Sequence, residues 1–418
     1  MKNRRVLILG GIFFLSCINF VYIAWFYEVH RYLPPPFVYD KENTFMDFYN
    51  TLYWSGQDGI YTVWKSVYPP LNFLFLQVYQ YLFLGDISGL GDGFAIRQGT
   101  GIQIFPLLSI YAISLLIAVR ISFRQIIDLK IQVIVFLICL LSPAFLFAME
   151  RGNLIILCVP ILSWFIFSKS QISRALALAV LVNLKPYFAI FYIVLLFNVK
   201  VRKENKDLLF LAPIFASILF LVTALLLNQE FYMMPMNLMG FATNSALVIS
   251  REVLSFPSSI TAFTYFRGLV TEFSVPPIIG YLAKLAVFAY LIKSLLMVYK
   301  CKVSFEDLTI FSIICITNYS ISTGGYGVLY YIPVIVLLYK QNAYFLLAVI
   351  VTSMYIGIWD VFPIYKYIGR DMNVYLSGET VKIEPFISLG SIIRPIANFT
   401  ILILFFKNLQ KRYLYAPI

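Results

Sequence analysis

The sequence is poor in charged side chains, in histidine and in paired cysteines, and each shortage excludes a class of protein. Only 12% of its 418 residues are charged, which is about half the share found in a soluble protein of this size. The single histidine, His30, excludes a multi-histidine metal centre and a histidine-based catalytic triad within this chain. The five cysteines are scattered without a CxxC pair, so neither a disulfide framework nor a thiolate metal site is predicted.

Apolar residues dominate what is present. They make up 61% of the sequence, and runs of roughly 18–20 apolar residues, the length of a membrane-spanning helix, recur along the chain. The sequence predicts an all-α polytopic membrane protein, a single integral membrane domain over residues 1–418, with about 11–13 transmembrane helices. The expected spans are Val6–Trp25, Tyr68–Leu84, Ile102–Val119, Ile131–Met149, Leu154–Phe167, Ala175–Phe197, Leu208–Leu227, Pro276–Val298, Leu308–Ile321, Leu329–Tyr339, Ala343–Ile358 and Phe386–Phe406.

Basic side chains gather in short segments between these spans. A formal net charge of +12 would suggest nucleic acid in a soluble protein. Here the clustering fits the positive bias of cytoplasmic loops, so no nucleic-acid partner is predicted. Contact with anionic membrane lipid is a second interpretation. The clusters are Lys200, Arg202, Lys203 and Lys206; Lys300 and Lys302; and Lys407, Lys411 and Arg412.

Three long loops carry few basic residues and many aromatic ones. They cover residues 26–67, 228–275 and 359–385. We expect them on the outer face of the cytoplasmic membrane, with interfacial helices lying on its surface. The first apolar run follows the cationic start MKNRR and is predicted to be a retained anchor with a cytoplasmic N-terminus.

One segment conflicts with this arrangement. Counting spans from the N-terminus places Arg120–Lys130, with its three basic residues, outside. A re-entrant segment between Tyr68 and Lys206 would remove the conflict. The best candidate is Ala175–Phe197, because Lys185-Pro186 interrupts it: proline breaks the helical ladder and lysine is costly in lipid. Two short helices meeting at Lys185 would place its amine in a protein cavity.

Polar residues in costly positions mark the candidate site. Asp47, followed by Phe48 and Tyr49, is either a general base made more basic by surrounding rings or the cap of a short interfacial helix. Tyr68, before two prolines, stands at a helix entry or contacts a substrate.

A second set of polar residues interrupts the apolar runs that follow. Glu150-Arg151-Gly152-Asn153 is a polar turn in which Arg151 can hold a phosphate and Glu150 a hydroxyl, or in which acid and base pair internally. Lys185 and the neighbouring Tyr187 line a functional cavity, or the lysine reaches the membrane surface. Weaker candidates are Arg251 and, in a glycine-rich interruption, Tyr326.

Taken in order, these motifs resemble the multispanning glycosyltransferases of the GT-C fold, and most closely glycosyltransferase family 87. Its members have an Asp followed by an aromatic residue in the first outer loop (here Asp47-Phe48), then Tyr-Pro-Pro (Tyr68-Pro69-Pro70), a polar turn ending in Asn (Asn153) and an intramembrane Lys-Pro (Lys185-Pro186). The likeness covers about the first half of the chain. Where some members carry a late histidine pair, this sequence has Gly324-Gly325-Tyr326.

The resemblance implies inverting transfer of a hexose or pentose from a polyprenyl-phosphate sugar to a lipid-linked or envelope glycan acceptor. Asp47 would take the proton of the acceptor hydroxyl, while Arg151 and Lys185 would stabilise the departing phosphate. The remaining candidates, Tyr49, Tyr68, Glu150, Asn153, Tyr187, Arg251 and Tyr326, would bind substrate. No DxD motif and no metal ligand set is present, although two outer-loop carboxylates leave room for a divalent cation.

Two alternative functions share these features. An O-antigen or capsule-type polymerase joins repeat units carried on lipid diphosphates and is also a basic, tyrosine-rich membrane protein. A transporter or flippase for lipid-linked sugars would also bury Arg151, Glu150 and Lys185 along a path. Inverted repeats would support a transporter, and none is apparent in the sequence.

Overall fold

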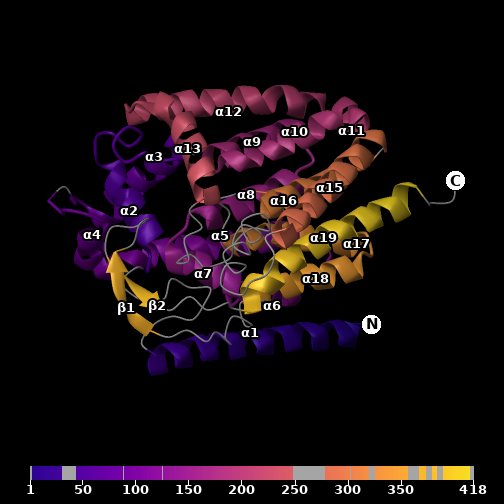
Figure 1. The fold of residues 1–418 in the computed structure, drawn as a ribbon, viewed down its shortest axis with the longest axis horizontal. Coiled ribbons are helices and arrows are strands. Elements are labelled where there is room, and N and C mark those ends of the chain that lie inside the picture. Colours follow the sequence, from indigo (N-terminus) through magenta and orange to yellow (C-terminus); the bar gives the residue numbers. More distant parts are fainter. Residues whose placement is uncertain are drawn as a thin grey trace.

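The structure is a computed structural model, and it describes residues 2–30, 44–87, 89–124, 126–247, 278–301, 303–319, 325–355, 367–372, 379–383 and 389–414. The fold is predominantly helical (Figure 1). The α-helices are α1 (Lys2–His30), α2 (Met46–Ser55), α3 (Pro70–Tyr79), α4 (Gly93–Thr100), α5 (Phe105–Phe123), α6 (Leu129–Leu140), α7 (Pro143–Arg151), α8 (Ile155–Phe167), α9 (Gln171–Leu184), α10 (Ala189–Phe197), α11 (Val199–Glu204), α12 (Lys206–Leu227), α13 (Met234–Leu247), α15 (Ile278–Lys300), α16 (Phe305–Tyr319), α17 (Tyr331–Lys340), α18 (Tyr344–Tyr355) and α19 (Leu389–Tyr413). Short 3₁₀ or π segments are η2 (Gln80–Leu84), η3 (Gly101–Ile104), η4 (Pro186–Phe188), η5 (Phe231–Met233) and η6 (Gly325–Tyr330).

Several helices have the length and composition of membrane spans. Within the described residues three qualify: Gly10–Val29 of α1, α5 and α12. The pair α6 and α7 makes a fourth if it counts as one span bent by 59°. That bend falls where Ser142 caps the first turn of α7 and Pro143 occupies its first position, which ends the ladder of α6. Each expected span overlaps at least one described helix, but several of these helices are only 10–14 residues long, so the number of spans stays a prediction.

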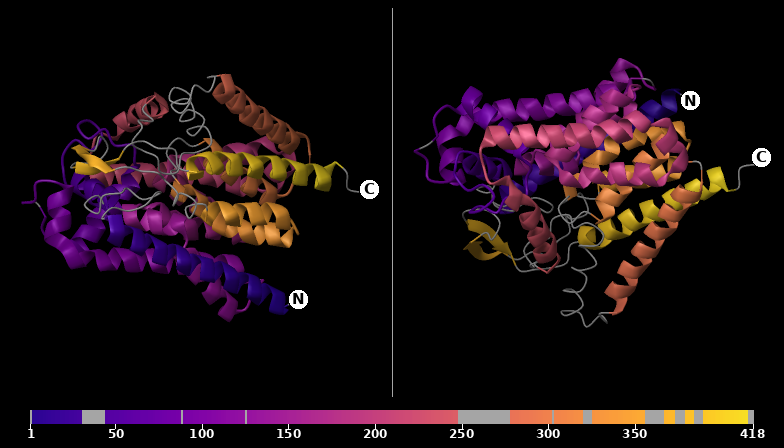
Figure 2. Two further views of the ribbon diagram at one scale, coloured as in Figure 1. Left: turned by 60° about the horizontal axis from the view of Figure 1, so that its bottom comes forward. Right: turned by 90° about the horizontal axis from the view of Figure 1, so that it is seen from above.

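The two ends of the molecule differ in character. Both termini lie at one end together with the basic helix α11, whereas α2, α4 and the pair of strands lie at the opposite end (Figures 1 and 2). This segregation matches the division expected between basic short segments and aromatic long loops. We call the first the basic end and the second the loop end.

The turn after α5 belongs to the basic end, which resolves the conflict in the sequence. Helix α5 packs along α8, where Ser122 Oγ donates a hydrogen bond to Ser163 Oγ at 3.0 Å. At the other ends of the same helices, Tyr111 OH donates to Gly152 O at 2.8 Å. The two helices are therefore parallel, and Arg120 and Arg124 lie beside the end of α8 that leads to α9.

The segment Ala175–Phe197 forms a helical hairpin that is broken at Lys185-Pro186, which is the shape expected of a re-entrant segment. Gln171, at the start of α9, donates to Glu204 O at 2.8 Å and accepts a hydrogen bond from Asp207 N at 3.1 Å. The chain therefore returns through α10 and α11 to the level at which it began. Deeper in, Asn183 Nδ2 donates to Ala216 O at 3.0 Å, so the hairpin tip reaches only the middle of α12.

Two expectations need correction. Tyr68–Leu84 does not form a span: α3 is 10 residues long, continues as the π-helix η2, and Tyr79 OH donates to Gln103 O at 2.8 Å beside the start of α5. The segment thus remains at the loop end. The third long loop also contains strands, β1 (Tyr367–Met372) and β2 (Glu379–Ile383), paired antiparallel with Met372 opposite Glu379. Helical periodicity gave no sign of this pair.

Candidate functional site

The carboxylate of Asp47 is aimed by an unusual start to α2. Phe45 precedes the helix in the left-handed conformation, with φ of 65°, and its side chain makes no cap. Its amide donates instead to Glu150 O at 2.6 Å. The cap interpretation of Asp47 is therefore wrong: the start of α2 is fastened to the α7–α8 turn, and the carboxylate is left available for that turn.

The α7–α8 turn is a tight reversal that requires a glycine. Gly152 has φ of +67°, and the amides of Gly152 and Asn153 donate back to Met149 O and Ala148 O, each at 2.9 Å. A Cβ on Gly152 would come within 2.7 Å of Phe48 Cβ. This close approach brings α2 against the end of α7, so the sequence ERGN places its side chains directly beside Asp47.

Asp47 is held by two of these side chains. One carboxylate oxygen pairs with Arg151, and the other accepts a hydrogen bond from Asn153 Nδ2 at 2.9 Å. Asn153 has little freedom, because its Oδ1 accepts from Ile155 N at 3.0 Å and its Nδ2 also approaches Tyr326 OH at 3.2 Å. The carboxylate is therefore preorganised, and Tyr326 reaches the site from η6.

Lys185 reaches the same site from the tip of the re-entrant hairpin. It ends α9 in an extended conformation, since Pro186 cannot continue the helical ladder. Two carbonyls left free by this break are bound by Asn72, whose Nδ2 donates to Leu184 O at 3.0 Å and to Asn183 O at 3.4 Å. The same nitrogen donates to Pro69 O, before α3, at 3.2 Å. One buried amide thus fixes the chain next to Lys185 and the chain next to Tyr68.

Tyr68 and Lys185 form a cation–π pair. The lysine Nζ lies 4.3 Å from the centroid of the Tyr68 ring. Burial, assisted by the negative charge of Asp47, raises the pKa of the Tyr68 hydroxyl well above its ordinary value. The hydroxyl therefore stays protonated and neutral, and it remains a hydrogen-bond donor at any physiological pH.

A small cavity joins the acid and the lysine. Its lining consists of Asp47, Thr51, Tyr68, Asn153, Leu154 and Lys185, and its empty volume, counting the open mouth, is ≈ 210 Å³. Lys185 is only 8% exposed, and among the residues the structure describes no carboxylate lies within ion-pair distance of it. A buried ammonium without a counter-ion is costly, so an anion entering this cavity would be bound favourably.

The structure gathers many of the predicted residues. Asp47, Tyr68, Asn153 and Lys185 line the cavity, and Tyr326 contacts Asn153 from behind. Arg151 is buried but does not line the cavity. Its charge serves Asp47 directly, and its Nη1 has no hydrogen-bond partner within the described chain.

Three other candidates point elsewhere, and one is not described. Tyr49 OH accepts a hydrogen bond from Thr100 Oγ1 at 3.3 Å in α4. Tyr187 OH shares a 2.6 Å hydrogen bond with Tyr330 OH, and Glu150 is buried and contributes its carbonyl to Phe45. None of these three lines the cavity. Arg251 lies outside the described residues.

Sequence reasoning missed three residues of this site. Thr51 lines the cavity one helical turn after Asp47, a spacing that becomes informative once residues 46–55 are recognised as a helix. Leu154 forms an apolar wall. Asn72 acts through backbone carbonyls that are free only because Pro186 breaks α9, so no local pattern announces it.

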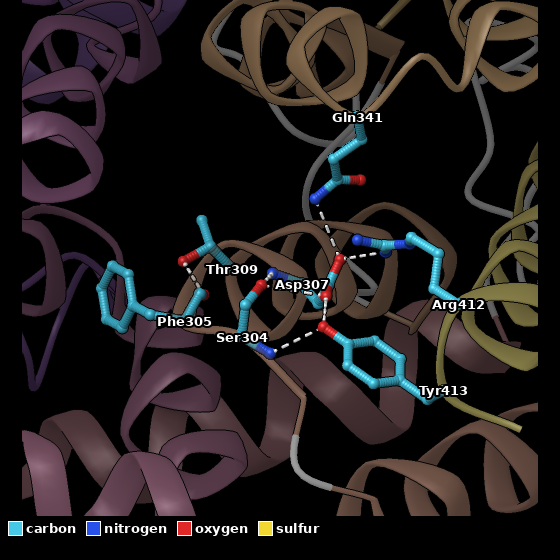
Figure 3. Close-up of polar contacts among 7 residues, drawn as sticks. All are labelled: Ser304, Phe305, Asp307, Thr309, Gln341, Arg412 and Tyr413. Atoms are coloured by element: carbon cyan, nitrogen blue, oxygen red, sulfur yellow. Dashed lines mark hydrogen bonds and ion pairs between the residues drawn. The ribbon is translucent and has the colours of Figure 1, made fainter. Parts of the chain in front are cut away.

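A second buried carboxylate lies at the basic end (Figure 3). Asp307 of α16 is fully buried and pairs with Arg412 of α19. It also accepts hydrogen bonds from Gln341 Nε2 at 3.0 Å, from Ser304 Oγ at 2.9 Å and from the Tyr413 hydroxyl. This cluster joins the ends of α16, α17 and α19.

Within the described residues no group of three or more His, Cys, Asp or Glu side chains has the arrangement of a metal site. The divalent cation considered from the sequence therefore remains a prediction. Comparisons with protein-family models, with curated proteins and with solved structures found no match.

Proposed function

We propose that the chain is an inverting glycosyltransferase that moves a sugar from a polyprenyl-phosphate donor to a lipid-linked or envelope glycan acceptor. The observation that carries this proposal is that one cavity holds a fixed carboxylate, Asp47, and a buried lysine, Lys185, with no carboxylate within ion-pair distance of the lysine among the described residues. A transfer of this kind needs a base at one end of the reacting group and a cation at the other.

The reaction assigns one role to each group. The acceptor oxygen attacks the anomeric carbon from the face opposite the phosphate, and its proton passes to the free lone pairs of Asp47. The bond from the anomeric carbon to the phosphate oxygen breaks, and the oxygen keeps the electron pair. The extra negative charge on the polyprenyl phosphate is stabilised by Lys185. Arg151 and Asn153 hold Asp47 in a fixed orientation during both events.

Arg151 therefore takes a different role from the one expected from sequence. It does not line the cavity, and its guanidinium is already paired with Asp47. We assign phosphate binding to Lys185, with the second nitrogen of Arg151 as a reserve donor once the cavity opens. Opening is required, since the present cavity has room for little more than a water molecule, whereas typical ligand sites measure roughly 300–1,000 Å³.

The proposal places the loop end outside and the basic end in the cytoplasm. Basic residues occur in the α5–α6 turn, in α11 and at the end of α19. Helix α11 and the end of α19 lie at the end that carries both termini (Figure 1), and the positive-inside bias favours a cytoplasmic position for such segments. The cavity then opens toward the outer face, where a lipid-borne donor and a growing glycan can meet. A cysteine-labelling map from each side of sealed vesicles tests this orientation.

A transporter is the second candidate, and the re-entrant hairpin is the observation that favours it. In many transporters the substrate binds at the ends of helices that are interrupted within the membrane. One experiment separates the two functions: purified chain in vesicles is supplied with a panel of polyprenyl-phosphate sugars and envelope glycan acceptors. Covalent glycan product, with the inverted anomeric configuration, is the expected result. Counterflow of the lipid-linked sugar without product would contradict the transferase.

A further inference from the structure

Helix α2 carries a row of side chains that starts at Asp47 and leads away from the cavity. Asp47, Thr51 and Trp54 are spaced i, i+4 and i+7, so they lie on one face of the helix. Asp47 and Thr51 line the cavity. Trp54 lies two turns further, about 10 Å along the helix axis, which is a distance of one to two sugar units.

Trp54 belongs to an aromatic cluster that is open to solvent. Its ring stacks on that of Trp64, with centroids 5.9 Å apart and planes at 20°, and Tyr53 meets Trp64 edge-on at 5.6 Å. Trp64 is 37% exposed. The cluster is thus a ring platform with one side packed and another side free.

The turn that presents Trp64 is rigidly built. Gln229 Oε1 accepts hydrogen bonds from Gly59 N at 3.0 Å and from Ile60 N at 3.3 Å. Asn237 Nδ2 donates to Tyr61 O at 2.8 Å and to Ser66 O at 3.1 Å. Side chains from the second long loop therefore hold both ends of the turn. A ring held in this way loses little freedom when a ligand stacks on it.

We propose that Trp54 and Trp64 form a platform on which a pyranose ring of the acceptor glycan stacks. The polarised C–H groups on one face of a pyranose are attracted to the negative face of an aromatic ring, and both surfaces leave water. The row on α2 then leads from this ring to Asp47, where the terminal hydroxyl reacts. The inference rests on the proposed function for the identity of the ligand as acceptor, whereas sugar binding itself does not.

The surroundings of the platform favour a sugar over lipid chains. Gln57 follows Trp54 in the turn, where its amide donates to Trp54 O at 3.1 Å, and exposed Asp58 comes next. Exposed Lys65 follows Trp64 directly. Groups able to bind hydroxyls thus flank the rings along the chain, and charged groups beside the rings would be costly in hydrocarbon.

The test is sugar binding by the full chain in a detergent that has no sugar headgroup. Saturation-transfer NMR monitors the titration with manno-, gluco- and galacto-trisaccharides. We expect at least one of the three to bind, and Trp64→Ala and Trp54→Ala to weaken its binding about tenfold. Trp64→Phe keeps a ring and should restore most of the affinity. Trp164→Ala is the matched control, because Trp164 is 38% exposed but lies on α8.

Two further measurements separate this inference from its alternatives. Asp47→Asn should bind the trisaccharide normally while losing transfer; if it transfers normally, the proposed function fails and the platform stands. In vesicles of brominated phosphatidylcholine, the fluorescence of Trp64 should be quenched much less than that of Trp164, each measured in a chain whose other tryptophans are Phe. Equal quenching, no trisaccharide binding, or unchanged binding by Trp64→Ala would each overturn the platform.

Discussion

Asp47 and Asp307 lie at opposite ends of the molecule and have different surroundings. Asp307 is enclosed by an arginine, a glutamine, a serine and a tyrosine, which together satisfy both carboxylate oxygens (Figure 3). Asp47 also has an arginine and an amide, but its side chain remains 19% exposed and it faces a cavity. An arginine and a side-chain amide therefore hold an aspartate in both places, but Asp307 is fully enclosed whereas Asp47 faces a cavity.

The difference lies in what is left unsatisfied. Around Asp307 both carboxylate oxygens are satisfied by protein donors, and the cluster holds three helix ends together. Around Asp47 the charges are unevenly placed: Arg151 interacts with both Asp47 and the buried Glu150, whereas Lys185 faces the cavity and has no carboxylate within ion-pair distance in the described structure. Buried groups with unmet electrostatic needs mark functional sites, and this contrast is open to direct experiments.

The largest expected effect is on turnover. Asp47→Asn keeps the shape and both neighbours but removes the base, so the rate of sugar transfer should fall by roughly 10²–10⁴-fold. Asp307→Asn should leave the rate per folded molecule within about twofold, because the cluster lies at the opposite end from the cavity. Initial rates normalised to folded protein check both variants. Equal losses in the two would remove the distinction between the sites.

Stability should respond in the reverse order. Asp307→Asn leaves Arg412 and Tyr413 without their charged acceptor, and we expect a loss of about 2–3 kcal/mol in the free energy of unfolding, discounted because Arg412 retains some exposure to water. The same change at Asp47 should cost less, since the Asp47 side chain is 19% exposed to solvent and Arg151 keeps Glu150 as a neighbouring carboxylate. Thermal unfolding in detergent measures both. A less stable Asp47→Asn than Asp307→Asn would argue against the contrast.

Replacing Lys185 tests whether a cation in this cavity binds the donor phosphate. Lys185→Met keeps the apolar stem and removes the cation, so we expect an equal or larger free energy of unfolding. The affinity for the donor phosphate should be roughly tenfold to hundredfold weaker. Lys293→Met is the matched control, because Lys293 also lies over a tyrosine ring, at 5.2 Å, but is exposed on α15. Donor affinity unchanged by Lys185→Met would exclude it from phosphate binding.

The smallest effect expected is that of Asn72. Asn72→Ala releases the carbonyls of Leu184 and Pro69, so Lys185 and Tyr68 lose their fixed separation. We predict an increase of about fivefold to tenfold in the KM for donor with kcat nearly unchanged, since ground-state and transition-state binding weaken together. A purely structural role would instead lower the yield of folded protein and leave KM unaltered. Steady-state kinetics on the folded fraction distinguishes these results.

The sequence predicted those residues of the site that are polar or charged and lie in or next to apolar segments, where burial is energetically costly. A lysine next to a proline in an apolar run cannot lie in lipid, so the hairpin and its buried tip followed from composition. Asp47 and Asn153 were found for the same reason. The partnership of Arg151 was not predictable, because it depends on a 2.6 Å hydrogen bond between Phe45 and Glu150 that joins segments about a hundred residues apart.

Other features could not be predicted, because the local sequence pattern does not determine where a segment lies in the folded protein. Tyr68–Leu84 is as apolar as a span, yet its prolines and its π-helical end keep it short and at the loop end. Thr51 could not be selected before α2 was known to be a helix. The strands β1 and β2 lie in a loop whose sequence alternates too little to mark them.

The central claim is that Asp47 acts on the acceptor while Lys185 holds the donor, so binding and turnover can be separated. The most direct measurement takes one preparation of Asp47→Asn and determines both the affinity for a polyprenyl-phosphate sugar and the single-turnover rate of transfer. We predict donor affinity within about twofold of the natural chain and a rate reduced at least a hundredfold. Affinity and rate falling together, or a rate that is unaffected, would contradict the account.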